Sequence, residues 1–261
     1  GRTLVRLGAG NLKSLVVAMV LGGFAYMTLR GLTGLARVEL EAATMVDLKA
    51  AGMAAQGLPD FLAALTDMPL TAARWVMSIV IAGGLLIFCF RSAAFRATPA
   101  NIAAGLILGA LAVAGWYVTG VIGFDDFEPT QLVSLTFVSP VGEGLVYLMT
   151  FTGSTINFGI AAAGGVIVGS FLMSLSRGEF RVESFVDSND MIRHIVGAAL
   201  MGMGGIMAMG CTIGQGITGM STLSAGSLIA VLSIIAGGVY GMKYLEEGSL
   251  GGALGALFQR D

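Results

Sequence analysis

Residues 195–242 read IVGAALMGMGGIMAMGCTIGQGITGMSTLSAGSLIAVLSIIAGGVYGM, and this stretch decides the fold class. It contains no Asp, Glu, Lys or Arg. A helix that crosses a bilayer needs about 20 predominantly apolar residues. The stretch is long enough for two such passes with a break between them. It therefore predicts a protein that lies in a membrane and crosses it more than once.

Four further regions of low charge precede this stretch, at 14–29, 75–90, 97–124 and 144–176. The first continues past Arg30 to Ala36, and the fourth leaves room for a span plus a short extra helix. Six spans result in total. Segments of this length, rich in Ala, Leu and Met, are unlike the short alternating strands of a membrane β-barrel. We predict an all-α, polytopic helical membrane protein.

The composition of the chain supports the same fold class. Hydrophobic residues make up 56% of the 261 residues and charged residues only 11%, whereas about 25% charged residues is usual in soluble domains. The mean hydropathy is +0.86. A net charge of -2 and the lack of a basic stripe argue against nucleic acid as a partner. The expected surroundings are a lipid bilayer.

We interpret residues 1–261 as a single membrane domain with five parts. These are the end of a first repeat (1–36), an extramembrane connection (37–71), middle spans with an outer loop (72–143), a second repeat (144–245) and a tail (246–261). Positive charge favours the cytoplasmic side of a membrane protein. The arginines at 91 and 96, and those within 177–193, therefore place their connections inside, and the acidic connection 125–140 falls outside.

The segment 209–219, MGCTIGQGITG, differs from the apolar residues around it. Each of its glycines destabilises a plain helix by roughly 1 kcal/mol relative to alanine. Non-helical backbone at membrane depth persists only when it is buried in protein or lines a polar cavity. We predict a broken or re-entrant segment whose N–H groups attract anions. The alternative is a short turn outside the membrane, which the absence of charge and the presence of a Cys disfavour. The candidate pathway residues are Gly210, Cys211, Thr212, Gly214, Gln215 and Gly216.

The opening of the chain repeats the register of this segment. Gly1 matches Gly214, Ser14 matches Ser227, and an apolar span with a glycine pair follows in both places. Transporters are often built from such repeats, with the substrate site at the repeat interface. The match predicts pseudo-repeat halves. It also predicts that the residue equivalent to Cys211 precedes Gly1, so that the first half is incomplete here.

Three stretches of the sequence resemble the YeeE/YedE (sulfur transport) family. The most specific is Gly210-Cys211-Thr212-Ile213-Gly214-Gln215-Gly216, which continues into STLSAGSL at 221–228. The others are RLGAGNLKSL at 6–15 and a third segment with Phe158-Gly159, Gly164-Gly165 and Gly169-Ser170. The resemblance implies an all-helical, multi-pass protein of the bacterial inner membrane that takes up thiosulfate or a related sulfur anion. It also implies pathway cysteines and a cytosolic sulfur-carrier protein as partner. Cys211 is the pathway cysteine that carries over.

The chemistry expected of Cys211 follows from its apolar surroundings. An anion that leaves water needs replacement donors. Backbone N–H groups of 210–216 and the side chains of Thr212 and Gln215 could supply them, and a neutral thiol could donate to a soft sulfur atom. A thiolate would repel the anion. Two alternatives stay open: a membrane sulfurtransferase that carries a persulfide on Cys211, and a subunit that needs a second chain.

Three other residues have simpler interpretations. Cys89 is expected to be a small packing residue at a helix end, and His194 an interfacial residue. Glu143 is expected to be a helix N-terminal charge that the helix dipole stabilises. No cofactor, metal or catalytic residue is predicted, and no nucleotide-binding motif is present.

Overall fold

The computed structural model describes residues 1–46, 48, 55–124, 131–185, 187–249, 251–252 and 255. Within these ranges the chain is helical, with two isolated β-bridges and no strand. The acidic positions 125–128, and parts of the predicted connection 37–71 and tail 246–261, lie outside the described residues.

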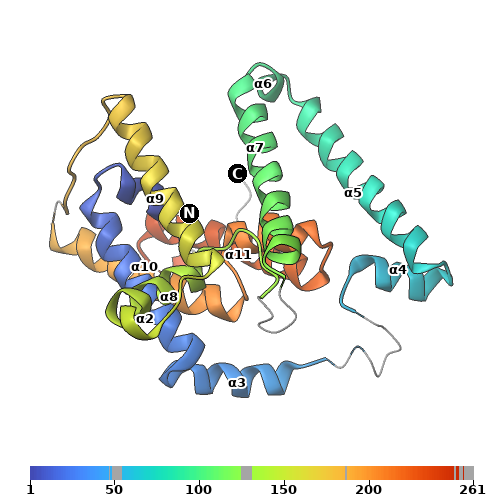
Figure 1. Cartoon of the computed structure of the whole chain (residues 1–261), viewed down its shortest axis with the longest axis horizontal. Coiled ribbons are helices and arrows are strands. Elements are labelled where there is room, and N and C mark those ends of the chain that lie inside the picture. Colours follow the sequence, from blue (N-terminus) through green and yellow to red (C-terminus); the bar gives the residue numbers. More distant parts are fainter. Residues whose placement is uncertain are drawn as a thin grey trace. The chain divides into compact units, whose positions relative to one another are not determined.

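The helices of the first part of the chain are α1 (Arg2–Gly8), α2 (Leu12–Arg30), α3 (Leu32–Thr44), α4 (Leu58–Thr66), α5 (Leu70–Arg91), α6 (Ala93–Arg96) and α7 (Pro99–Tyr117), which continues as the π-helix η1 (Val118–Ile122). Those that follow are α8 (Val138–Met149), η2 (Phe151–Gly153), α9 (Phe158–Ser176), α10 (Ser188–Met207), the π-helix η3 (Gly214–Gly219) and α11 (Ala225–Glu247). Figure 1 labels most of them along the chain.

Five of the described helices are long and apolar enough to cross a membrane. They are Leu12–Arg30, Leu70–Arg91, Pro99–Ile122, Phe158–Ser176 and Ala225–Glu247. This confirms the all-α, polytopic fold class. Six spans were predicted, and the difference lies in α10. That helix begins at Ser188 and carries Asp190 and Arg193 in its first turns, so its apolar part before Met207 is short.

The first span also ends earlier than predicted. Gly31 has φ -111° and ψ -155°, an extended conformation that stops α2 at Arg30. Its N–H still donates to the carbonyl oxygen of Met27 at 2.8 Å, which satisfies one of the last carbonyls of the helix. The residues up to Ala36 therefore belong to α3, a separate helix.

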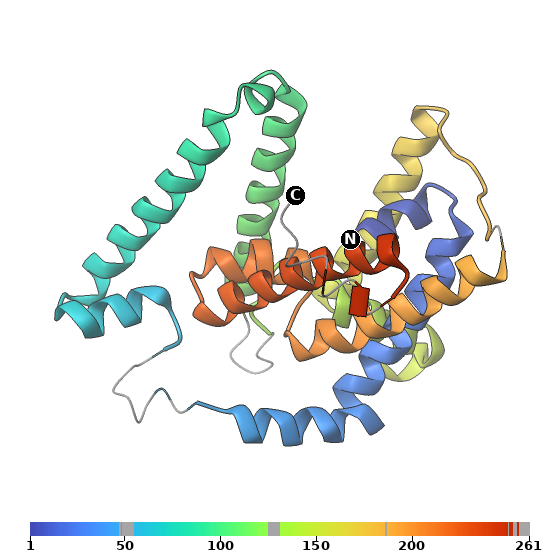
Figure 2. The same cartoon turned by 180° about the vertical axis from the view of Figure 1, so that it is seen from behind.

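Two compact units make up the chain, and each is described by itself. The first comprises Gly1–Asp47 and Val80–Thr218, and the second Leu48–Ile79 and Gly219–Asp261. In the first unit α2 packs against α8 and α10, and α1 packs against α9. Figure 2 shows this group of helices from behind. Leu21 and Ala25 of α2 share a buried apolar cluster with residues of α8 and α10.

Glycines allow the helices of the first unit to approach closely. A Cβ atom on Gly202 of α10 would lie 2.5 Å from the carbonyl oxygen of Leu21. On α2, a Cβ atom at Gly22 would lie 2.6 Å from a methyl group of Leu145. Small residues at such positions are typical of membrane helix interfaces. These glycines allow α2 to pack closely against both α8 and α10, so α2 is the central helix of this unit.

A similar turn precedes α2 and α11. Gly10 has φ 96° and Leu223 has φ 53°, and each stands just before the N-cap residue of its helix, Asn11 or Ser224. In both cases the first helical N–H donates to a carbonyl oxygen far away in sequence: Leu12 to Glu183 at 2.9 Å, and Ala225 to Gln56 at 3.0 Å. This is the register in which Ser14 matches Ser227. The observation supports the pseudo-repeat, which stays a prediction.

Candidate functional site

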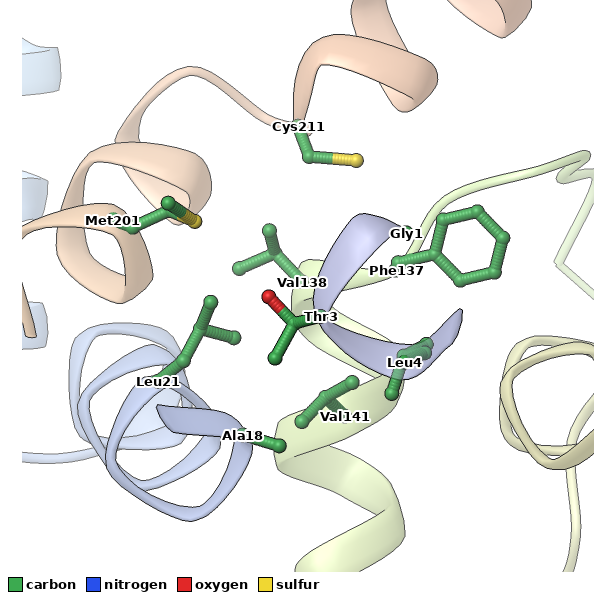
Figure 3. Close-up of a pocket in the computed structure, with 10 residues that line it drawn as sticks. All are labelled: Gly1, Thr3, Leu4, Ala18, Leu21, Phe137, Val138, Val141, Met201 and Cys211. Carbon is green, nitrogen blue, oxygen red and sulfur yellow. The ribbon is translucent and has the colours of Figure 1, made fainter. Parts of the chain in front are cut away.

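Cys211 lines a small cavity in the first unit. The cavity has a volume of about 50 Å³, and Figure 3 shows the thiol pointing to the side where Phe137 and Gly1 lie. Its walls come from α1, α2, α8 and α10 and from the segment that precedes α8. The lining residues are Gly1, Thr3, Leu4, Ala18, Leu21, Phe137, Val138, Val141, Met201 and Cys211. The cavity is therefore mostly apolar, with two sulfur atoms and one side-chain hydroxyl.

The end of α10 determines where Cys211 lies. Met209 adopts the left-handed conformation with φ 55°, which stops the helix. The N–H of Met209 donates to Ile206 at 2.9 Å, and that of Gly210 donates to Gly205 at 2.8 Å. These bonds satisfy carbonyl groups at the helix end. The chain then turns away from α10 at residues 208–210, and Cys211 follows this break.

Cys211 also caps the helical segment that follows it. Its carbonyl oxygen accepts the N–H of Gln215 at 2.7 Å. Its Sγ atom accepts the N–H of Gly214 at 3.4 Å. The sulfur thus takes the position of an N-cap acceptor, where the positive end of the peptide dipoles points toward it. This arrangement holds the side chain at the edge of the cavity.

Gln215 fixes the break from the other side. The residue is 9% exposed, and its Nε2 atom donates to the carbonyl oxygen of Ala208 at 2.5 Å. Ala208, the first residue after α10, is thereby tied to the start of η3. Thr218, near the end of η3, donates from Oγ1 to the carbonyl oxygen of Leu135 at 2.7 Å. The segment that carries Phe137 into the cavity is therefore bound to η3.

The structure separates the six predicted pathway residues. Only Cys211 lines the cavity. The N–H groups of Gly210, Gly214 and Gln215 already donate to partners inside the protein. These three N–H groups are therefore not free in this structure to bind an anion, as was predicted for residues 210–216. Thr212 is exposed, Gly216 is half-buried, and neither belongs to the lining. Their part in a pathway stays a prediction.

Sequence reasoning missed Thr3. Among the lining residues it has the one hydroxyl side chain, and Figure 3 shows its oxygen on the side of the cavity where Cys211 lies. The repeat register was the available signal, since it matches Gly1 with Gly214 at the start of η3. Among the described residues, no group of three or more His, Cys, Asp or Glu side chains gathers as metal ligands would.

Comparison with known proteins identifies the family of the chain. A sequence profile described as Sulphur transport matches residues 1–240. The chain belongs to this family. Within the Sulphur transport family, it is similar to the thiosulfate transporter TsuA of Escherichia coli (strain K12), with 30% identity over 112 residues. The matched residues are 43% of this chain and 30% of that relative. The resemblance expected from the Gly-Cys motif is thereby confirmed.

Replacing Gln215 by leucine is expected to increase the reactivity of Cys211 toward a maleimide severalfold. The variant keeps the side-chain volume but leaves the carbonyl oxygen of Ala208 without its donor, which costs roughly 1–3 kcal/mol for a buried group. The break would then open more often and expose the thiol. The rate of maleimide labelling in detergent measures this. Thr222→Val is the matched control, because Thr222 is exposed and bonds only to Gly219 in its own turn. Equal rates in both variants would contradict the role given to Gln215.

Proposed function

We propose that this chain provides part of a pathway for thiosulfate, or a closely related sulfur anion, across a bacterial inner membrane into the cytoplasm. The observation that supports this most strongly is the position of Cys211, beyond a broken helix and in an otherwise apolar cavity. Membership of the Sulphur transport family supports the same reading. The matched region covers under a third of TsuA, so transport by the whole protein belongs to the proposal.

The cavity suits an anion with one soft and one hard end. A thiosulfate ion carries a terminal sulfur and three oxygen atoms. In the proposal the thiol of Cys211 donates a hydrogen bond to the terminal sulfur, and the hydroxyl of Thr3 donates to an oxygen. The apolar walls offer nothing to replace the remaining water of a more strongly hydrated ion such as sulfate. Selectivity for thiosulfate over sulfate then comes from the small number of hydrogen-bond donors in the cavity. Gln215 acts as a positioning residue.

The sulfurtransferase alternative receives less support. A persulfide carrier needs an activated thiol, usually beside a His or a cation. Among the residues that the structure describes, no His, Lys, Arg or carboxylate side chain lines the cavity. The single His194 instead lies beside Asp190, with 3.2 Å between its Nδ1 and Oδ1 of the aspartate. A cytosolic sulfur-carrier protein that receives the anion remains part of the proposal.

Growth on thiosulfate tests the proposal. A bacterium that cannot use other sulfur sources is expected to grow when it expresses the protein, and excess sulfate is expected to leave thiosulfate uptake unchanged. Thr3→Val keeps the shape of the side chain and removes the hydroxyl, so we expect uptake to fall about tenfold, the equivalent of about 1.4 kcal/mol. Thiosulfate uptake equal to that of cells without the protein, at verified membrane abundance, would contradict the proposal.

A further inference from the structure

A second cavity lies in the first unit and shares no lining residue with the first. Its volume is about 370 Å³. Tyr26 and Arg30 of α2, Glu143 and Tyr147 of α8, and Asn157 line it. Arg30 is the last residue of α2 and Asn157 the N-cap of α9, and both helices are candidate spans. Since spans end at the membrane surface, the cavity lies at the level of the lipid headgroups. Tyrosine is typical of that level.

The carboxylate of Glu143 is held in place on one side of this cavity. Its Oε1 atom accepts a hydrogen bond from Ser139 Oγ at 3.1 Å, and its Oε2 atom accepts one from Asn157 Nδ2 at 2.5 Å. Asn157 in turn caps α9, where its Oδ1 accepts the N–H of Ile160 at 2.9 Å. Glu143 lies in the middle of α8 and not in its first turn, so the predicted dipole role is wrong. Helix α8 begins at Val138, five residues before Glu143, so Glu143 lies beyond the first turn.

Each oxygen of Glu143 can still accept a further hydrogen bond. An ionised carboxylate has about four acceptor positions, and Ser139 and Asn157 use one on each oxygen. Tyr26 and Tyr147 line the same space. This side of the cavity therefore suits a ligand group that is positively charged and carries N–H donors.

Arg30 provides the opposite charge. The side chain lines the cavity and its residue is exposed. Both Arg30 and Glu143 are described residues, and no ion pair joins them. Two opposite charges thus face one cavity without neutralising each other. A guanidinium binds phosphate through two parallel hydrogen bonds. The ligand that matches both charges is one that has a phosphate and an ammonium group.

We propose that this cavity binds the headgroup of a zwitterionic phospholipid with a primary ammonium, phosphatidylethanolamine in type. The ammonium lies at Glu143 and the phosphate at Arg30. Large apolar side chains continue from the cavity at the end of α8 and in η2: Leu148 is 74% exposed, Met149 77% and Phe151 67%. Acyl chains that hang from a headgroup at this level would cover them. A choline headgroup lacks N–H donors and would bind more weakly.

Native mass spectrometry of the protein in detergent, with added lipids, tests this directly. We expect retention of phosphatidylethanolamine to exceed that of phosphatidylcholine and of phosphatidylglycerol by about tenfold, the equivalent of about 1.4 kcal/mol. Glu143→Gln should remove the preference for the ammonium lipid over the anionic lipid. Arg30→Gln should weaken both, and it should leave the fold intact because the residue is exposed. Arg177→Gln and Glu179→Gln, at the other end of α9, are matched controls that should change neither.

Three results would overturn the assignment. One is equal retention of all three lipids by the parent protein. Another is a Glu143→Gln variant, folded by circular dichroism, that retains the lipids as the parent does. The third is displacement of the lipid by thiosulfate, which would make the cavity a site for the transported anion. Soluble phosphoethanolamine is a separate arm: weaker binding than the lipid supports a membrane lipid as ligand, and equal or tighter binding contradicts it. None of these readouts depends on transport.

Discussion

A Cys211→Ala variant is expected to lose at least about tenfold of its thiosulfate uptake while it keeps its fold. The substitution removes the single thiol of the cavity, together with the acceptor that caps the Gly214 N–H. A lost hydrogen bond to a charged partner corresponds to roughly 1.5–3 kcal/mol, or about a tenfold to hundredfold change. The measurement is uptake of labelled thiosulfate into cells or vesicles at equal membrane abundance.

Cys211→Ser and Cys89→Ala complete this experiment. Serine retains a donor of similar size but offers a harder atom, so intermediate uptake is expected. Cys89 lies near the end of α5 and does not line the cavity, so its replacement should leave uptake unchanged. If Cys211→Ala takes up thiosulfate as well as the parent does, the pathway does not use this thiol. A loss that is equal in Cys89→Ala would indicate a general thiol effect instead.

A Gly202→Ala variant is expected to be strongly destabilised, although alanine is the better helix former. The new Cβ atom would lie 2.5 Å from the carbonyl oxygen of Leu21 and 3.1 Å from the backbone nitrogen of Ala25. Both atoms belong to the backbone of α2, so no side-chain rotation relieves the overlap. Overpacking of this kind costs about 1–3 kcal/mol, occasionally more. A lower midpoint of thermal unfolding in detergent is the expected readout.

Gly204 supplies the matched control on the same helix. A Cβ atom there meets nothing within 4 Å, and alanine stabilises an exposed helix position by roughly 1 kcal/mol relative to glycine. Gly204→Ala should therefore unfold at the same temperature as the parent or slightly above it. Comparable midpoints for the two variants would show that the close contact between α2 and α10 does not limit stability.

The sequence was informative about spans because length and hydropathy are local properties. Three of the five candidate spans coincide with regions found from charge alone, and α9 and α11 each occupy the second part of a longer region. The start of α10 was harder to predict. Its polar first turns are used within the protein, where Lys13 of α2 pairs with Asp190 at 2.7 Å. A long-range contact of this kind leaves no trace in a hydropathy pattern.

The site was predictable in part for a related reason. Cys211 stands out because a thiol among four glycines in an uncharged segment is conspicuous, and the family motif includes it. Thr3 is one ordinary residue near the start of the chain, and only the packing of α1 beside α2 and α9 brings it to the cavity. Glu143 likewise meets Asn157 only when α8 folds back against α9.

Helices α2 and α8 form walls of both cavities. Ala18 and Leu21 of α2 line the Cys211 cavity, and Tyr26 and Arg30, further along the same helix, line the second. A helix that borders two ligand sites can couple them. Any such linkage is reciprocal: a headgroup that raises the affinity for the anion by some factor is itself bound more tightly, by that factor, when the anion is present. The lipid composition of the membrane would then act as an effector of transport.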